Sequence, residues 1–104
     1  MSDFLYIAQL AIPAEKEEEF NAIYDAGYIP ALLSVPGVLK ADRYKLIWSD
    51  VDEMPEYLAT YELEAPEIPN SPAWKAASVN CGWAEHIRPH LVVRRHGMFR
   101  RFGG

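Results

Sequence analysis

The chain has only one cysteine, Cys81, among its 104 residues. An internal disulfide is therefore impossible, and there is no cluster of thiolates that could hold zinc. No apolar run approaches the roughly 20 residues of a membrane-spanning helix, and the first residues lead into a predicted strand without the basic segment that begins a signal peptide. We expect a reduced, cytoplasmic and soluble protein with no membrane partner.

Basic residues are also scarce: 10 lysines and arginines stand against 15 acidic residues, which gives a net charge of −5. This balance argues against nucleic acid as a partner, because phosphate binding needs a basic surface. A basic stretch near the C-terminus is interpreted as lying beside the acidic half of its own or a partner chain. It contains Arg88, Arg94, Arg95, Arg100 and Arg101.

Several motifs of catalysis are missing as well. The sequence has no glycine-rich phosphate loop, no Gly-x-Ser-x-Gly elbow and no zinc-ligand spacing, which argues against nucleotide use, elbow-type hydrolysis and metalloenzyme chemistry. His86 and His90 are four residues apart, but Pro89 interrupts the helical face that such a metal-binding pair needs. We therefore expect neither a metal nor a cofactor.

Apolar residues are abundant by contrast: half of the chain is hydrophobic and 12% is aromatic, which predicts one domain spanning residues 1–104. Residues 4–12 read as a strand with two apolar faces, because side chains alternate along a strand. A domain with about two helices covers only one face of a sheet. We therefore predict a homodimer in which a second copy covers the other face. One face holds Phe4, Tyr6, Ala8, Leu10 and Ile12, and the other holds Leu5, Ile7 and Ala11.

The next segment reads as a helix with an acidic first turn after Pro13, in which Tyr24 and Tyr28 share the buried stripe. Pro30 lies inside this pattern and is expected to loosen the turn before it, because proline lacks a backbone donor and crowds the carbonyl four residues earlier. Val35-Pro36-Gly37 should end the helix in a type II turn, with a positive φ at Gly37.

Residues 38–48 and 56–64 read as strands, a proline-rich loop follows, and Ser71 should cap a helix that runs toward Cys81. A short helical piece over 83–88 and a final strand over 91–102 complete the chain. The order is β-α-β-β-α-β, which predicts a ferredoxin-like α+β fold with a four-stranded antiparallel sheet and both helices on one face.

With this order in place, several motifs carry a family resemblance. They are the acidic helix start after Pro13, Tyr24, the run from Tyr28 through Ile-Pro-Ala-Leu-Leu-Ser-Val-Pro to Gly37, the aromatic pattern of residues 57–63, and Ser71-Pro-Ala-Trp74. The sequence resembles the dimeric α+β barrel superfamily, in particular small bacterial proteins near its EthD-like branch. The resemblance implies that two ferredoxin-like sheets form a barrel in a dimer. Many relatives have a histidine before Ile-Pro, where this chain has Tyr28.

Two residues are candidates for proton transfer. His96 lies within the last predicted strand, and histidine is the side chain best suited to proton transfer near neutral pH; Tyr28 is the other candidate. An aromatic set suits a planar organic ligand in a cleft between helices and sheet, or else packs as an ordinary core. The predicted ligand-binding residues are Tyr24, Tyr61, Trp74, Trp83 and Arg43, the last placed to orient a carboxylate or carbonyl.

Because the superfamily includes enzymes of several kinds and proteins without a known reaction, the fold does not choose between functions. One reading is a cofactor-free enzyme acting on a small aromatic or polyketide-like molecule. The alternative is a non-catalytic dimeric binding or accessory protein whose aromatics pack. A haem-dependent monooxygenase is a distant third reading, since no histidine is matched to an axial ligand.

Overall fold

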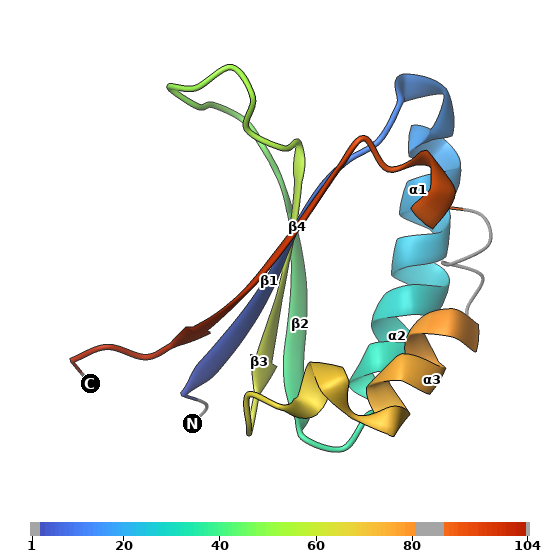
Figure 1. Cartoon of the computed structure of the whole chain (residues 1–104). Helices are drawn as coiled ribbons and strands as arrows, with labels where there is room; N and C mark the ends of the chain where they lie inside the picture. The colour runs from blue at the N-terminus through green and yellow to red at the C-terminus, as the bar shows by residue number, and fades with distance from the viewer. Residues whose placement is uncertain (1–2, 81–86, 104) are drawn as a thin grey trace.

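The computed structural model describes residues 3–80 and 87–103. Within these residues a four-stranded sheet is covered on one side by helices (Figure 1). The strands are β1 (Phe4–Ala11), β2 (Val38–Lys45), β3 (Tyr57–Leu63) and β4 (Val93–Arg100), and the main helices are α1 (Glu17–Ile23), α2 (Ile29–Leu33) and α3 (Pro72–Asn80). Short 3₁₀ turns occupy Ala14–Lys16, Ile68–Asn70 and Arg88–His90. No helix of the described residues is both long and apolar enough to cross a membrane.

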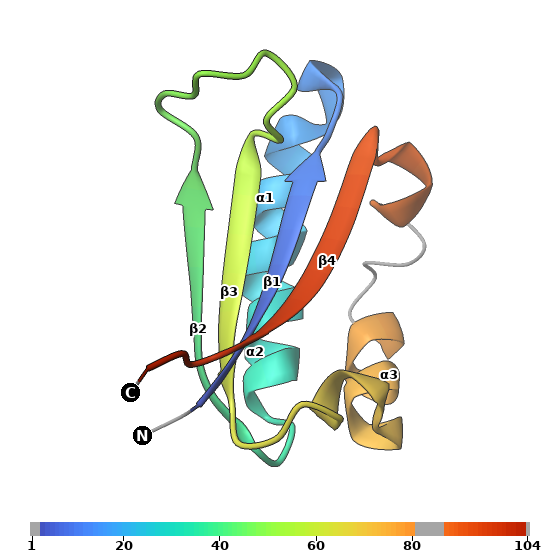
Figure 2. The ribbon, with the colours of Figure 1, turned by 60° about the vertical axis from the view of Figure 1, so that its left-hand side comes forward.

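The strand order is β2-β3-β1-β4, and every neighbouring pair is antiparallel. This arrangement confirms the predicted ferredoxin-like α+β fold. Residues directly opposite in antiparallel strands share a face, so the register places Tyr6, Tyr61 and Met98 on one face. That face carries the helices; in Figure 2 α1 and α2 lie behind the sheet and α3 lies to the right of it.

The opposite face of the sheet, called here the open face, has no helix over it in the described part of the chain (Figures 1 and 2). The register places Leu5, Leu58 and Tyr44 there, together with Phe99. Leu5 is 36% exposed, and Tyr44 and Phe99 are each 54% exposed. The two-sided apolar pattern of the first strand therefore has the predicted structural meaning: one face packs against helices, and the other is left uncovered in a single copy.

The first helical segment is not a uniform α-helix. Residues Tyr24–Tyr28 form a π-helical turn between α1 and α2, in which the N–H of Ile29 donates to the carbonyl of Tyr24, five residues earlier. Pro30 follows in the first turn of α2 and has no N–H to donate to Ala26. The expected loosening of the helix before this proline is thus present as a wider turn.

Two turn signals in the sequence also have the expected geometry. Gly37 has a φ of +92°, and the N–H of Val38 donates to the carbonyl of Val35 at 3.1 Å across the Pro36-Gly37 turn. Ser71 caps α3, because its Oγ accepts a hydrogen bond from the N–H of Trp74 at 3.2 Å.

The second strand is shorter than the sequence pattern predicts. β2 ends at Lys45, and one more bond, from the N–H of Leu46 to the carbonyl of Glu56 at 2.7 Å, closes the ladder. Ile47 and Trp48 then leave the sheet with 98% and 78% of their surfaces exposed. Their β-forming side chains continued the strand pattern, but no partner strand extends that far among the described residues.

Candidate functional site

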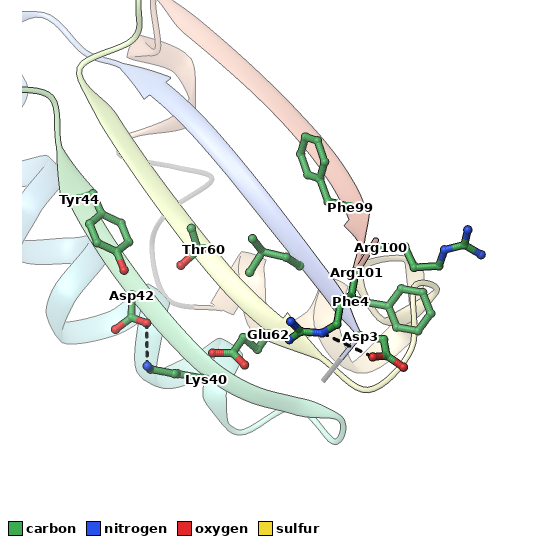
Figure 3. Close-up of a pocket in the computed structure, with 11 residues that line it drawn as sticks. Asp3, Phe4, Lys40, Asp42, Tyr44, Thr60, Glu62, Phe99, Arg100 and Arg101 are labelled. Atoms are coloured by element: carbon green, nitrogen blue, oxygen red, sulfur yellow. Dashed lines mark ion pairs between the residues drawn. The ribbon is translucent and has the colours of Figure 1, made fainter. Parts of the chain in front are cut away.

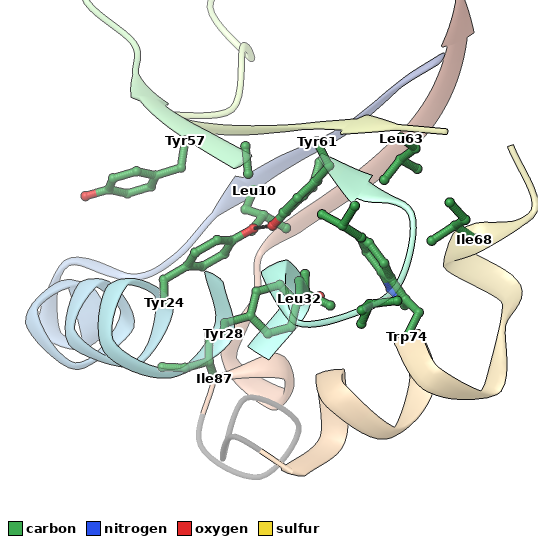
Figure 4. Packing of buried hydrophobic residues seen from close by; sticks show 14 of the residues in the cluster. Leu10, Tyr24, Tyr28, Leu32, Tyr57, Tyr61, Leu63, Ile68, Trp74 and Ile87 are labelled. Atoms are coloured by element: carbon green, nitrogen blue, oxygen red, sulfur yellow. Dashed lines mark hydrogen bonds between the residues drawn. The ribbon is translucent and has the colours of Figure 1, made fainter. Parts of the chain in front are cut away.

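A layer of aromatic side chains fills the space between the helices and the sheet (Figure 4). Tyr24 projects from the π-helical turn and Tyr61 from the centre of β3, and each is 1% exposed. Their hydroxyl groups form a hydrogen bond of 2.8 Å. The pairing is what makes their burial tolerable, because each phenol would otherwise lose its bond to water without replacement.

Both phenols are held in the neutral form. Burial raises the pKa of Tyr24 to about 12, although the hydrogen bond with Tyr61 and the charge of Arg43 oppose the rise. Burial also raises the pKa of Tyr61 well above its ordinary value. Neither side chain is a proton acceptor near neutral pH in this environment, and the pair serves as a hydrogen-bonded wall.

The other predicted aromatic residues join this layer from its two ends. Tyr28 packs edge-on against Tyr24 with ring centroids 4.9 Å apart. Trp74, from α3, packs edge-on against Tyr61 at 5.4 Å and against Tyr6 at 5.6 Å. Tyr28 and Trp74 are 9% and 6% exposed. The structure therefore brings four of the predicted site residues together with Tyr6, and packs them against one another.

Arg43 lies at the β2 side of the same layer. Its guanidinium donates to Asp25 Oδ1 at 2.7 Å and to Asn21 Oδ1 at 2.8 Å, and its Cζ lies 4.5 Å from the centroid of the Tyr24 ring. A cavity of about 260 Å³ opens beside it, also lined by Asn21 and Tyr57. Arg43 thus joins the helix to the edge of the sheet, with the planar fork stacked on an aromatic face.

Replacing Arg43 with methionine is expected to lower the free energy of unfolding by about 1–2 kcal/mol, because two charge-assisted hydrogen bonds and the stacking on Tyr24 are lost. Urea denaturation followed by circular dichroism measures the change. Arg43→Lys is the matched control: it keeps the charge but not the fork, so it should recover only part of the loss. Full recovery by lysine would contradict the importance of the planar geometry.

His96 sits at the other side of the layer, on β4. The register pairs it with Ala8, so it shares the helix-covered face with Tyr6. Its imidazole stacks on the Tyr6 ring with centroids 5.7 Å apart and an interplanar angle of 22°, and the residue remains exposed to solvent. Partial burial of the imidazole lowers the pKa of His96 from 6.5 to about 4, and the positive charges of Arg94 and Arg88 act in the same direction.

Tyr6, a member of the aromatic set that the sequence proposes as pocket walls, links His96 to Tyr61 and Trp74 by ring contacts. Arg94 was absent from the predicted site; it precedes His96 by two residues on the same face of β4. Its alternation with His96 along the strand is the signal that could have found it. Trp83, Cys81 and His86 lie outside the described residues, and the described residues contain no cluster of three or more His, Cys, Asp or Glu suited to a metal.

The chain is similar to known proteins at the level of structure. No protein-family model matches it, and no curated protein sequence matches it. Solved structures do match. An EthD-family protein from Bacillus halodurans gives a TM-score of 0.62 at 13% identity, over 90% of this chain and 96% of that chain.

Two further structures have similar scores. A dimeric ferredoxin-like protein of unknown function from Thermobifida fusca gives a TM-score of 0.63 at 15% identity, over 95% of this chain and 91% of that chain. A mutant form of SnoaB, a cofactor-independent oxygenase from Streptomyces nogalater, gives 0.64 at 16% identity, over 100% of this chain and 97% of that chain. At these identities the likeness is one of fold alone: the chain has the predicted ferredoxin-like α+β fold, with EthD-family and oxygenase structures among its structural neighbours.

Proposed function

We propose that the chain is a homodimeric, cofactor-free enzyme that binds a small planar aromatic or polyketide-like molecule beside Tyr6 and His96, with His96 as the proton acceptor. The observation that carries the proposal is the position of His96. It is an exposed imidazole stacked on an aromatic ring, whereas Tyr24, Tyr28 and Tyr61 are buried.

The charge state of His96 suits this role. With a pKa of about 4 the imidazole is neutral at pH 7, so its free ring nitrogen can accept a proton from a ligand hydroxyl. A base of such low pKa needs help to deprotonate a phenol, whose own pKa is near 10. Arg94 supplies it, because a positive charge beside the site stabilises the anion that remains after the proton has moved.

The remaining predicted residues would form the walls. Trp74 and Tyr61 contact Tyr6 from one side, so a planar molecule against Tyr6 would meet an apolar aromatic layer that excludes water. Tyr28 stays a prediction as a second proton-transfer residue; its ring packs edge-on against Tyr24. SnoaB, with a similar fold, is described as a cofactor-independent oxygenase, which supports chemistry of this kind without a metal or flavin.

The homodimer is part of the proposal because of the open face. Leu5, Tyr44 and Phe99 leave apolar surface on a side of the sheet that no described helix covers. Soluble monomers rarely expose apolar patches larger than a few hundred Å². A second copy placed sheet against sheet would cover this surface, and one of the structurally similar proteins is described as dimeric.

Titration of the protein with small phenols and quinones tests the proposal, with tryptophan fluorescence reporting binding and dioxygen uptake reporting turnover without added cofactor. We expect saturable quenching, and a turnover that falls as the pH is lowered through about 4, where His96 becomes protonated and can no longer accept a proton. His96→Gln should reduce turnover by about 10²-fold or more.

The exposed His90 provides the matched control, and His90→Gln should behave as the wild type. Tyr28→Phe should keep the fold, and unchanged binding and turnover in this variant would remove Tyr28 from the site. Absence of saturable quenching in the wild type would rule out the proposed ligand site beside Tyr6 and His96. Turnover in His96→Gln equal to that of the wild type would remove the proton-acceptor role.

A non-catalytic binding or accessory protein is the second candidate, and a specific observation favours it. The hydroxyls of Tyr24 and Tyr61 satisfy each other at 2.8 Å, and both side chains are packed in the core. In this reading the aromatic layer stabilises the fold and the functional surface is the open face. Binding of the phenols or quinones without turnover in any condition would favour the binding or accessory protein. A shift of the Soret band on titration with haemin would instead favour the haem-dependent monooxygenase.

A further inference from the structure

The loop between β2 and β3 carries several strongly exposed apolar side chains. This loop, residues 46–56, is called here the arm. Ile47 and Trp48 are 98% and 78% exposed, and Val51 is 51% exposed. Exposure of an indole to water is unfavourable, because a tryptophan side chain can bury roughly 150–250 Å² of surface when it packs. These exposed side chains therefore indicate a docking element.

The arm lies on the side of the open face. Figure 1 shows it leaving the end of the sheet away from the helices, and in Figure 2 it forms the loop above β2 and β3. The contact from Gln9 Nε2 to Met54 Sδ at 3.8 Å agrees with this position, because Gln9 points to the open face. The arm is therefore directed toward whatever covers that face.

A groove of about 480 Å³ lies on the same face (Figure 3). Its apolar side chains on the open face are Leu5, Tyr44 and Phe99. The register puts Leu5 opposite Glu62 and Phe99, near the end of the sheet where β1 begins. The arm joins β2 to β3 at the other end, where Lys45 pairs with Tyr57. The groove therefore runs along the face from Leu5 and Phe99, at the end away from the arm, to Tyr44 near the start of the arm.

Charge distinguishes two ways of placing a second copy on this face. If the two-fold axis ran along the strands, the arms would meet, and the arm contains only acidic charges. If the axis ran across the strands, each arm would meet the groove end of its partner, where Arg100 and Arg101 lie together with Asp3 and Glu62. Like charges disfavour the first arrangement. The groove itself balances its lining charges, with Lys40 near Asp42 at 3.5 Å and Arg101 near Asp3 at 3.7 Å.

We infer that the groove receives the arm of a second copy of this chain, with Trp48 of each protomer seated among the aromatic walls of the other. The two-fold axis then crosses the strands, and the interface closes on itself because each copy supplies one arm and one groove. This inference rests on the proposed homodimer and adds to it the arrangement of the two sheets and the anchoring residue. Central aromatic anchors in desolvated pockets usually dominate such interfaces.

Sedimentation equilibrium of the full chain tests the anchor. Trp48→Ala should raise the dimer dissociation constant by at least about 30-fold, as expected for an interface hot spot. The matched control is Leu33→Ala, which truncates an exposed apolar side chain on α2, and it should dissociate as the wild type does. Circular dichroism of both variants checks that the fold is retained.

Charge reversal tests the arrangement independently. Replacing Asp50 and Asp52 by lysine should weaken the dimer about 10-fold, and so should replacing Arg100 and Arg101 by glutamate. A chain carrying all four changes has an arm without net charge, because Glu53 and Glu56 remain, and an acidic groove end, so the repulsion between arm and groove is removed and the affinity should return to within about 3-fold of the wild type. If the two arms contacted each other instead, the four combined changes would not restore the affinity of the dimer.

The outcomes separate this inference from the proposed function. A wild type that stays monomeric at micromolar concentration removes the homodimer and the inference with it. A stable wild-type dimer that Trp48→Ala leaves as tight as Leu33→Ala overturns the inference alone. A chain with all four charge changes that dimerises as weakly as the two double variants also overturns the inference. Binding of a small phenol or quinone in the groove of the intact dimer would show that a small molecule, and not the arm, occupies the groove.

Discussion

Replacing Gly37 with valine is expected to lower the free energy of unfolding by about 2–6 kcal/mol. The φ of +92° at this residue is a conformation that L side chains rarely adopt, and a β-branched residue there is strained by roughly 1–3 kcal/mol. In addition, a Cβ at this position would overlap Cδ1 of Ile68, which is itself buried. Moving Ile68 adds a packing cost of about 1–3 kcal/mol.

Thermal and urea denaturation measure this effect, and Gly103→Val is the matched control. Gly103 also has a positive φ, of 67°, but no atom lies within 4 Å of a Cβ built there, and it stands near the chain end. Its substitution should leave the melting temperature almost unchanged. An unchanged melting temperature in Gly37→Val would show that the Pro36-Gly37 turn does not need this geometry.

Replacing Tyr61 with alanine should cost about 3–5 kcal/mol, the usual effect of removing a large aromatic side chain from a core. Tyr61 stands at the centre of β3, 1% exposed, and contacts Tyr6, Tyr24 and Trp74. Its removal would leave a cavity beneath three other aromatic rings. In a domain of this size the variant would be close to unfolded at about 25 °C.

Tyr61→Phe separates the ring from the hydroxyl. It keeps the ring contacts and removes the 2.8 Å hydrogen bond to Tyr24, so we expect a loss of about 0.5–1.5 kcal/mol. The double variant Tyr24→Phe, Tyr61→Phe removes both partners and should be less destabilised than the sum of the two single changes. Strict additivity in chemical denaturation would contradict a direct coupling between the hydroxyls.

Much of the fold could be predicted because its signals are local. The alternation from Phe4 to Leu10, the Pro36-Gly37 turn and the Ser71 cap each depend on neighbouring residues, and each has the expected structure. The end of β2 could not be predicted in this way. Ile47 and Trp48 have strand-forming side chains, and only the length of β3 shows that they leave the sheet.

The site was predictable only in part, for a related reason. Helical spacing placed Tyr24 beside Tyr28, and their packing follows from it. The stack of His96 on Tyr6 depends instead on the register between β1 and β4, which puts Ala8 opposite His96. A shift of one residue would turn His96 to the open face, and the sequence of β4 alternates too weakly to exclude that shift.

The π-helical turn also corrects the phase of the helix that contains it. Phe20 and Leu32 are both 0% exposed, although twelve residues separate them. At about 100° per residue an unbroken α-helix would rotate these side chains about 120° apart. A π turn absorbs one extra residue, so the helix behaves as if about eleven residues separated them, and the angle falls to about 20°. The wider turn before Pro30 is therefore what lets both ends of the helix face the same sheet.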